Sequence, residues 1–466
     1  MSDLHALTAA ELCAAYAARR LSPVEVTRAA LAHMSRWEPH LNAMFLVDEE
    51  AALAQARAAE SRWKAGAPFC ALDGVPVTIK ENIATKGDKA PIGTAANESL
   101  APADADAPPA ARVREAGCVI LGKSTMPDYG MLSSGLSSIH GITRNPWRLE
   151  RNTSGSSSGA GAAAAAGYAP LNLGTDIGGS VRLPATHCGV FALKPSLGRV
   201  PVYPPYLGRV TGPMTRTVRD AALLMNVLAR PDARDFMNLP CEPRDYSAGL
   251  EGLEPKGLRI GFLPDMKTGL AVHPEVRAAA QAAAKALAAA GAIVEEIGSF
   301  LAPEMLEGMC RFFEARSNND FLLLPSERQH KVLPFIAEWC TWRASAFTGR
   351  DVMTAYGQVM AMREAAVRTC EPYDFVISPT SPILAYAAEL ACPGNDPRNA
   401  LPHIAFTIPY SMSEQPAASV NWAASTDGLP IGVQVAGHRF DDWGVLRLAR
   451  LLEKLRPAQL PWPTPG

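Results

Sequence analysis

The sequence predicts one layered α/β domain, and three observations support this prediction. Segments typical of strands and of helices alternate along the chain, no internal repeat is present, and no low-complexity linker divides the 466 residues. The alternation is clearest where two apolar, strand-like segments, 256–264 and 293–297, enclose an alanine-rich helical segment at 273–290. Such alternation is typical of α/β folds, and large α/β folds reach this length as single units.

The first 66 residues are predicted to form helices. Thr8 with Glu11, and Ser22 with Glu25, each have the spacing of a capping box. In that motif a hydroxyl and a carboxylate satisfy backbone N–H groups at the start of a helix. The helices expected here cover 8–18, 23–38 and, in an alanine-rich segment, 48–65.

The middle of the chain, 67–230, mixes short apolar segments with helical ones. An alanine run near its centre predicts a tightly packed helix, because alanine favours helices and lets neighbouring elements approach closely. A segment rich in proline and aromatic residues, 196–212, is expected to line the mouth of a pocket. The elements predicted are a strand at 75–79, a helix and then a strand within 108–121, a helix at 159–167, a buried strand at 188–194 that includes Cys188 as a core residue, and an amphipathic helix at 216–229.

Residues 300–370 are predicted to be mainly helical, and they contain many Met, Phe and Trp side chains. Such side chains either pack a core or form the apolar wall of a ligand site. We expect this segment to line the substrate pocket, with Cys310 facing it. The last elements predicted are strands at 373–379, 406–409 and 427–437, and a helix at 441–454.

Composition argues against several classes of protein. The chain is 48% hydrophobic and 19% charged, as expected for a globular protein with a large core. Its net charge of −2 gives no reason to expect nucleic acid or an anionic membrane as a partner. The nine cysteines lack C-x-x-C pairs, so neither a disulfide framework nor a zinc site is predicted. The N-terminus is not signal-like and no apolar run reaches about 18 residues, so neither a secretory signal nor a spanning helix is expected. The odd number of scattered cysteines favours reduced thiols, and a cytoplasmic location is therefore expected.

Two glycine-serine segments carry the strongest functional signal. Gly155 to Gly159 and Gly174 to Ser180 are joined by the alanine run. Successive backbone N–H groups in a glycine turn can converge on one point and stabilise a developing oxyanion. A serine at the end of such a turn, here Ser180, is placed where an acyl nucleophile belongs. A plain Gly/Ser loop is the alternative interpretation of either segment taken alone.

Lys80 follows the apolar strand at 75–79 and has two interpretations. A lysine at the end of a strand is usually solvated. A buried lysine, in contrast, loses its charge more easily and becomes a usable base.

The motifs that surround these residues resemble the amidase signature family of serine hydrolases. The resemblance rests on GVPVTIKEN at 74–82, on GSSSG at 155–159 and on GTDIGGSVRLPATHCGVFALKP at 174–195, and it extends from about residue 5 to about residue 455. It implies a single domain spanning 1–466, built on a large twisted mixed β-sheet between layers of α-helices. Within it, 1–66 would form the N-terminal helices and 67–230 the core that carries the active site.

The resemblance implies a Ser–cis-Ser–Lys triad. Ser180 matches the nucleophile, Lys80 matches the base, and Ser156, twenty-four positions before Ser180, matches the bridging serine. Ser154 and Ser158 stand where the family usually has glycines, and Ser157 is the alternative bridging serine. The peptide before the bridging serine is expected to be cis. Activity is expected to rise toward alkaline pH, because the base must be uncharged.

Other roles are also implied by the resemblance. The backbone N–H groups of Ile177, Gly178, Gly179 and Ser180 would form the oxyanion hole. The residues expected to contact substrate or support the site are Met131, Ser133, Asp176 and Arg182. No metal and no organic cofactor is expected.

The activity implied is hydrolysis of a carboxylic amide, with esters or carbamates as further substrates. One alternative is a subunit that releases ammonia for a partner in a tRNA-dependent amidotransferase. Others are specialised aryl acylamidases, carbamate hydrolases and lactam-oligomer hydrolases. A nucleotide-binding module is disfavoured, because no lysine follows the glycines as in a P-loop. The partner expected is a small amide, with no nucleic acid or membrane, and the chain is expected to be a monomer or homodimer.

Overall fold

A mixed β-sheet of eleven strands runs through the part of the chain that the computed structural model describes, residues 4–464. The order across the sheet is β1-β3-β2-β8-β10-β9-β14-β15-β13-β11-β12. The strands are β1 (Met44–Val47), β2 (Pro76–Lys80), β3 (Val119–Ser124), β8 (Leu171–Asp176), β9 (Phe191–Lys194), β10 (Val210–Thr215), β11 (Arg259–Phe262), β12 (Ile293–Glu296), β13 (Phe375–Pro379), β14 (Ala417–Ala424) and β15 (Pro430–Gly437). The predicted domain ends, residues 1–3 and 465–466, lie outside the described residues.

The sheet is parallel in two places and antiparallel elsewhere. Strands β3, β2 and β8 run parallel to one another, and so do β13, β11 and β12. Two short antiparallel pairs lie outside the large sheet: β4 (Leu136–Ser137) with β5 (Gly141–Ile142), and β6 (Arg144–Asn145) with β7 (Arg148–Asn152). The α/β class and the mixed sheet predicted from the sequence are therefore confirmed.

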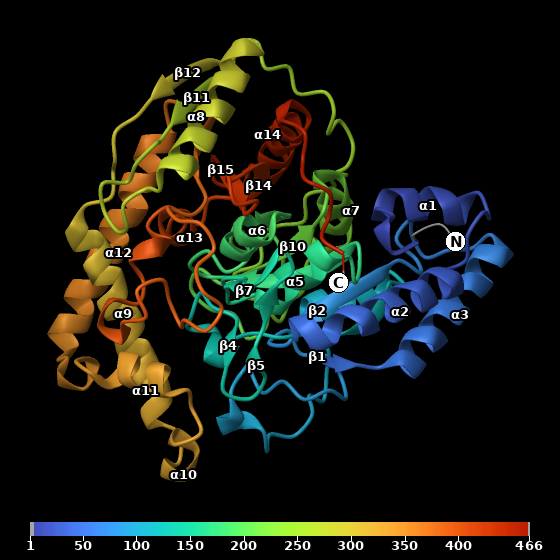
Figure 1. Cartoon of the computed structure of the whole chain (residues 1–466), viewed down its shortest axis with the longest axis horizontal. Coiled ribbons are helices and arrows are strands. Elements are labelled where there is room, and N and C mark those ends of the chain that lie inside the picture. The colour runs from blue at the N-terminus through green and yellow to red at the C-terminus, as the bar shows by residue number, and fades with distance from the viewer. Residues whose placement is uncertain (1–3, 465–466) are drawn as a thin grey trace.

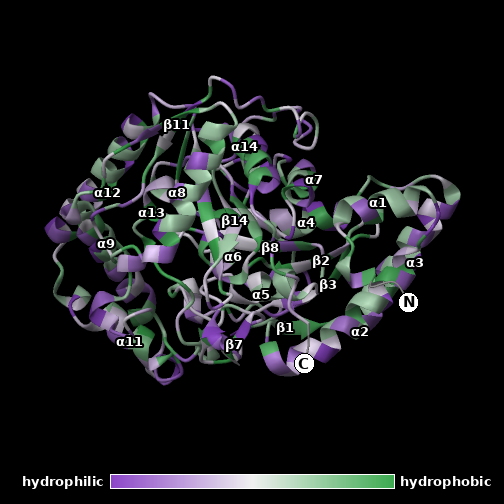
Figure 2. Ribbon diagram, turned by 45° about the horizontal axis from the view of Figure 1, so that its top comes forward, coloured by the Kyte–Doolittle hydropathy of each residue, from purple (hydrophilic) through white to green (hydrophobic). Residues whose placement is uncertain are grey.

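Helices flank the sheet and extend beyond it. They are α1 (Ala9–Ala17), α2 (Pro23–Leu41), α3 (Glu49–Ala65), α4 (Pro108–Glu115), α5 (Ser158–Ala166), α6 (Arg182–Cys188), α7 (Val218–Leu228), α8 (Pro274–Ala289), α9 (Pro303–Leu322), α10 (Ser326–Gln329), α11 (Pro334–Thr341), α12 (Gly349–Cys370), α13 (Ile408–Met412) and α14 (Asp442–Leu455). Figure 1 shows α1–α3 at one end of the molecule and α9–α12 at the opposite end. Figure 2 shows that outer helices such as α3 and α12 carry both hydrophilic and hydrophobic residues.

Two helix starts follow their sequence signals directly. At Thr8 and Ser22 both halves of the capping box are present: each hydroxyl accepts a backbone N–H, and Glu11 or Glu25 accepts the N–H of the capping residue. Within residues 4–464, none of the helices combines the length and apolar character needed to cross a membrane.

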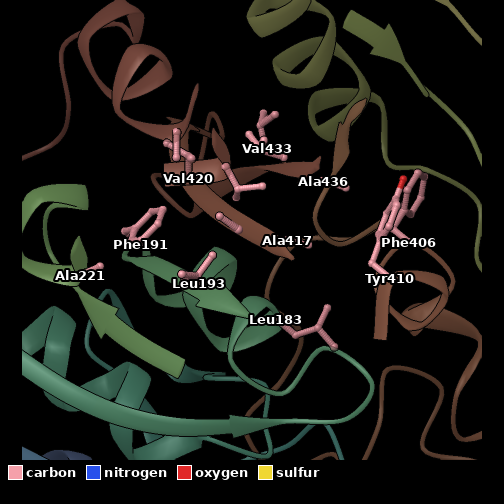
Figure 3. Close-up of a cluster of buried hydrophobic side chains, with 14 of the residues drawn as sticks. Leu183, Phe191, Leu193, Ala221, Phe406, Tyr410, Ala417, Val420, Val433 and Ala436 are labelled. Atoms are coloured by element: carbon pink, nitrogen blue, oxygen red, sulfur yellow. The ribbon is translucent and has the colours of Figure 1, made fainter. Parts of the chain in front are cut away.

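The core is continuous around the centre of the sheet. Every residue of α5 is buried, so this helix is enclosed by protein on all sides. Figure 3 shows a neighbouring part of the core, where side chains of β9, β14 and β15 lie with Leu183 of α6 and Tyr410 of α13. All nine cysteines, each of them within the described residues, are free.

Two predicted elements differ from the structure and one central strand was not predicted, and a proline is involved in each of these three cases. Cys188 ends helix α6 instead of starting a strand; Pro184 is in the first turn of that helix and Gly189, with φ of 69°, follows its end. Residues 406–409 are not a strand, because Pro409 lies in the first turn of the short helix α13, which begins at Ile408. The central strand β10 was not predicted, since its Gly212-Pro213 pair is typical of a turn.

Two helical glycines allow the packing of α5 to be tested. A Cβ added at Gly159 would lie 2.2 Å from the Ala43 carbonyl oxygen and 2.5 Å from the Thr125 amide nitrogen, both of them backbone atoms. A Cβ at Gly357 in α12 would meet nothing within 4 Å. We expect Gly159→Ala to lower the free energy of unfolding by about 1–3 kcal/mol and Gly357→Ala to raise it by about 0.5–1 kcal/mol, measured by urea denaturation. A Gly159→Ala variant as stable as the wild type would contradict the close packing of α5.

Candidate active site

The site begins where two parallel strands end. Strands β2 and β8 are neighbours in the sheet and run in the same direction, with Ile79 opposite Leu173. Lys80 is the last residue of β2 and Asp176 the last residue of β8. Because the carboxyl ends of parallel strands meet at one edge of a sheet, the turn 177–181 emerges beside Lys80.

The serine segment before α5 reaches the same edge. The Gly155–Ser156 peptide is cis, and α5 begins at Ser158. The amide of Ser157 donates to the carbonyl oxygen of Ser180 at 3.1 Å. The two glycine-serine segments identified in the sequence are therefore joined directly through their backbones.

Lys80 is fully buried, and its amine lies among hydroxyl groups. Its Nζ donates to the Oγ atoms of Ser156 and Ser157, each at 2.9 Å, and to Oγ1 of Thr175 at 3.0 Å. Burial lowers the pKa of Lys80 to about 7, against the smaller opposing effect of the Asp176 carboxylate. The amine can therefore lose its charge near neutral pH, as a base must.

The two serines beside Lys80 differ in their other contacts. Ser157 Oγ also donates to the carbonyl oxygen of Thr175 at 3.1 Å and accepts the Thr175 amide at 3.2 Å. For Ser156 Oγ, the Lys80 contact is the sole hydrogen bond within the described part of the chain. A Cβ built on Gly130 would lie 3.2 Å from Ser156 Oγ, and Gly130 lines the cavity described below. Ser156 thus lies close to the cavity wall.

The turn after β8 is held by one carboxylate. Asp176 accepts the N–H groups of Gly179 at 2.7 Å and Val181 at 3.2 Å. The Gly179 N–H is therefore already engaged, which differs from its expected place in the oxyanion hole. No acceptor in residues 4–464 pairs with the N–H groups of Ile177, Gly178 and Ser180.

Asp176 is in turn fixed by Arg182, and both side chains are fully buried. Arg182 donates to Asp176 through Nε at 3.1 Å and Nη2 at 3.0 Å. Its other hydrogen bonds go to Ser411 at 2.8 Å, and to Thr407 and Gln434 at 2.9 Å each. Although burial acts in the opposite direction, the Arg182 guanidinium keeps the pKa of Asp176 below its usual value. Asp176 thus stays ionised and holds the turn.

Ser180 lines a cavity that is partly open to solvent. The predicted residues Met131 and Ser133 line it, and the carbonyl of Ser133 accepts the Tyr386 hydroxyl. From the predicted helical segment, the lining includes Phe313, Arg316 and Trp339.

Some expected contacts are not present. Cys310 does not line this cavity, and burial raises the pKa of its thiol to about 12. Across residues 4–464, no hydrogen bond joins Ser156 to Ser180, so the structure unites Lys80 with Ser156 but leaves the Ser180 hydroxyl facing the cavity. In the same described residues, no cluster of three or more His, Cys, Asp or Glu is arranged to hold a metal ion.

Thr175 was missed by the sequence analysis. Its hydroxyl accepts from Lys80 and, at 3.1 Å, from Nδ2 of Asn82. The available signal was its position immediately before Asp176, but a threonine within a strand is common and carries little information by itself.

Comparison with known proteins identifies the family. The sequence model described as Amidase matches residues 25–446. This chain belongs to the amidase family. The resemblance found in the motifs is thereby confirmed.

Relatives in this family cover nearly the whole amidase chain. A glutamyl-tRNA(Gln) amidotransferase subunit of Myxococcus xanthus is 34% identical, over 96% of this chain and 97% of its own length. The structure of a bacterial aryl acylamidase of the amidase signature family has a TM-score of 0.89 and 27% identity, covering 97% of both chains. The structure of 6-aminohexanoate cyclic dimer hydrolase has a TM-score of 0.86 and 28% identity, covering 98% of both.

The buried amine should make the stability of this amidase depend on pH. Between pH 7 and 10.5 the unfolded chain keeps the Lys80 proton and the folded chain does not, so the free energy of unfolding rises with pH. We expect wild type to gain stability relative to Lys80→Met by up to about 1.4 kcal/mol per pH unit in that range. Urea denaturation from pH 7 to 9 measures this.

Lys86→Met, at an exposed position near Lys80 in sequence, is the matched control. Its free energy of unfolding should change with pH in the same way as that of wild type. A constant difference between wild type and Lys80→Met across this range would show that Lys80 does not titrate near pH 7 when folded.

Proposed function

We propose that this amidase-family chain hydrolyses carboxylic amides through a covalent acyl-enzyme on Ser180. The observation that carries the proposal is the buried Lys80 amine, 2.9 Å from Ser156 and with its pKa lowered to about 7, beside a glycine turn that ends at Ser180. A buried amine without a paired carboxylate is suited to take a proton rather than to form a structural ion pair.

The proposed reaction transfers one proton in a relay. Ser180 Oγ attacks the amide carbonyl carbon, its proton passes to Ser156 Oγ, and the Ser156 proton passes to uncharged Lys80. The same relay, run in reverse, protonates the nitrogen of the leaving amine as the carbon–nitrogen bond breaks. Water then attacks the acyl-enzyme by the same steps and releases the carboxylic acid.

Three backbone N–H groups are proposed to stabilise the oxyanion: those of Ile177, Gly178 and Ser180. Within residues 4–464 these N–H groups have no acceptor, and they belong to a turn that Asp176 holds through two backbone hydrogen bonds. Donors fixed in this way need not reorganise when negative charge develops on the carbonyl oxygen.

Ser156 is favoured over Ser157 as the bridging serine. The Ser157 hydroxyl is committed to both backbone groups of Thr175, so turning toward a reacting Ser180 would break two hydrogen bonds. The Ser156 hydroxyl has only Lys80 as a partner within residues 4–464 and lies near the cavity wall.

The cavity supports an amide with an apolar portion. Much of its lining is apolar, including Met131, Ile177, Phe313 and Trp339. Ligand sites typically combine such walls with a few polar groups. Anilides are a reasonable first substrate class, since an aryl acylamidase is among the similar structures. The same acyl-enzyme chemistry would serve esters and carbamates.

A second candidate function is that of the amidase component of a tRNA-dependent amidotransferase, releasing ammonia for a partner protein. The 34% identity with a glutamyl-tRNA(Gln) amidotransferase component over 96% of this chain favours it. A purified chain that elutes as a single species and turns over amides alone supports the hydrolase. Turnover that appears only with partner proteins supports the amidotransferase.

The nucleophile is tested by Ser180→Ala with a panel of 4-nitroanilides, aliphatic amides and carbamates. We expect wild type to hydrolyse at least one class and Ser180→Ala to lose about 10⁴-fold or more in kcat, with an unchanged melting temperature. A sulfonyl fluoride should label the wild-type peptide containing Ser180, as mass spectrometry would show.

Ser35→Ala, at an exposed position on α2, is the control and should keep full activity. Substantial turnover by Ser180→Ala would remove Ser180 from the nucleophile's role.

The bridging serine is tested by comparing Ser156→Ala with Ser157→Ala. We expect Ser156→Ala to lower kcat about 10²- to 10⁴-fold, because a proton-transfer group is lost. Ser157→Ala should instead lower the free energy of unfolding by about 1–3 kcal/mol, because it leaves buried polar groups of Thr175 unpaired, with a smaller loss of kcat. The opposite order of kcat values would assign the bridge to Ser157.

A further inference from the structure

Arg316 is the single charged side chain in the lining of the Ser180 cavity, among the described residues. It comes from helix α9, and its side chain is 24% exposed. Its Nε atom is buried and has no hydrogen-bond partner. The nearest carboxylate, Asp320, is 4.0 Å from that atom and 52% exposed, so the pair is too long for a hydrogen bond and largely screened by water.

A second cation lies next to Arg316. The guanidinium of Arg316 is 4.9 Å from the ring centroid of Tyr206, and that of Arg209 is 5.4 Å from the same ring. Arg209 donates to the carbonyl oxygen of Pro204 at 3.3 Å, and within residues 4–464 no carboxylate forms an ion pair with it. Burial and then the charge of Arg316 lower the pKa of Arg209, because the two guanidinium groups carry like charges.

The charges around the reacting atoms do not cancel. Asp176 is neutralised by Arg182, and Lys80 is uncharged when it acts as a base. Arg316 and Arg209 therefore leave an excess of positive charge beside a mostly apolar cavity. A guanidinium with a free, desolvated N–H group binds a carboxylate through short, charge-assisted hydrogen bonds.

We propose that Arg316 determines substrate specificity by pairing with a carboxylate that the amide substrate carries away from its scissile bond. The inference rests on the proposed function and narrows the substrate class to acidic amides. The carboxylate belongs either to the acyl part or to the amine part, and two probe pairs distinguish these cases. Arg316 takes no part in the proton relay.

Binding to Ser180→Ala tests the proposal without any need for turnover. One probe pair is the mono-4-nitroanilide of glutaric acid and its methyl ester, with the charge on the acyl side. The other is 4-acetamidobenzoate and its methyl ester, with the charge on the amine side. Calorimetry should show that the acid of at least one pair binds about 10- to 100-fold more tightly than its ester.

When Arg316→Gln is added to Ser180→Ala, the dissociation constants of the acid and the ester should lie within threefold of each other. When Arg316→Lys is added instead, part of the preference for the acid should remain. The matched control is Arg311→Gln, on the same helix, where the arginine pairs with Glu307 at 2.8 Å. This control removes one positive charge away from the cavity and should keep the full preference. Loss of preference there as well would indicate a general effect of charge and overturn the proposal.

Two further results would overturn it. The first is that the acid binds no more tightly than its ester in either probe pair. The second is that Arg316→Gln weakens the binding of the acid and of the ester equally, as expected if Arg316 has only a structural role through Tyr206. Turnover of neutral amides by wild type separates the two hypotheses. If that turnover depends on Ser180 while the acid preference is absent, only the role of Arg316 fails. If no amide is hydrolysed, the proposed function fails independently of the binding result.

Discussion

The burial of the Lys80 amine is the constraint on which the rest of this site depends. An isolated ammonium ion is costly to remove from water, and the protein supplies three hydroxyl oxygens instead of a carboxylate to compensate. A hydroxyl group can accept from the charged amine and can donate to the uncharged one, whereas a paired carboxylate would fix the charge. The neighbouring acid Glu81 is directed elsewhere, to His140 and the Gly93 amide, each at 2.7 Å. The Lys80 amine therefore has no carboxylate partner that would hold it in the charged form.

Asp176, the second buried ionisable group, differs from Lys80 because it has a partner of opposite charge. It is fully paired with Arg182 and also accepts two backbone N–H groups of the turn. A carboxylate that accepts from five donors, the Ser411 hydroxyl included, has little tendency to move or to take up a proton. Its function in the fold is therefore to fix the backbone of residues 177–181. The adjacent strands β2 and β8 thus end in two groups with contrasting roles, one free to titrate and one held ionised.

The small-residue helix α5 makes this arrangement possible. Its glycine and alanine side chains let the helix approach the sheet closely enough to bring Ser156 and Ser157 to the Lys80 amine. A larger residue at Gly174 in β8 would meet Ser157 Oγ at 2.8 Å, so the strand also contributes to the fit. The close packing of α5 and β8 therefore also fixes the positions of the side chains in the site.

Local sequence patterns determined the helices with capping boxes, the alternating α/β order and the motifs around Lys80, Ser156 and Ser180, because these signals depend on residues close together in the chain. Only the tertiary structure decided which charges are paired and which are not. Arg316 becomes the cation of the cavity because α9 packs across a site built from residues 130–180. The Gly179 N–H is not a free donor, because it donates to the Asp176 carboxylate. The central strand β10 is recognisable only from its partners β8 and β9. The burial of a side chain and the pairing of a charge depend on neighbours that are distant in sequence, so a local sequence pattern cannot predict them.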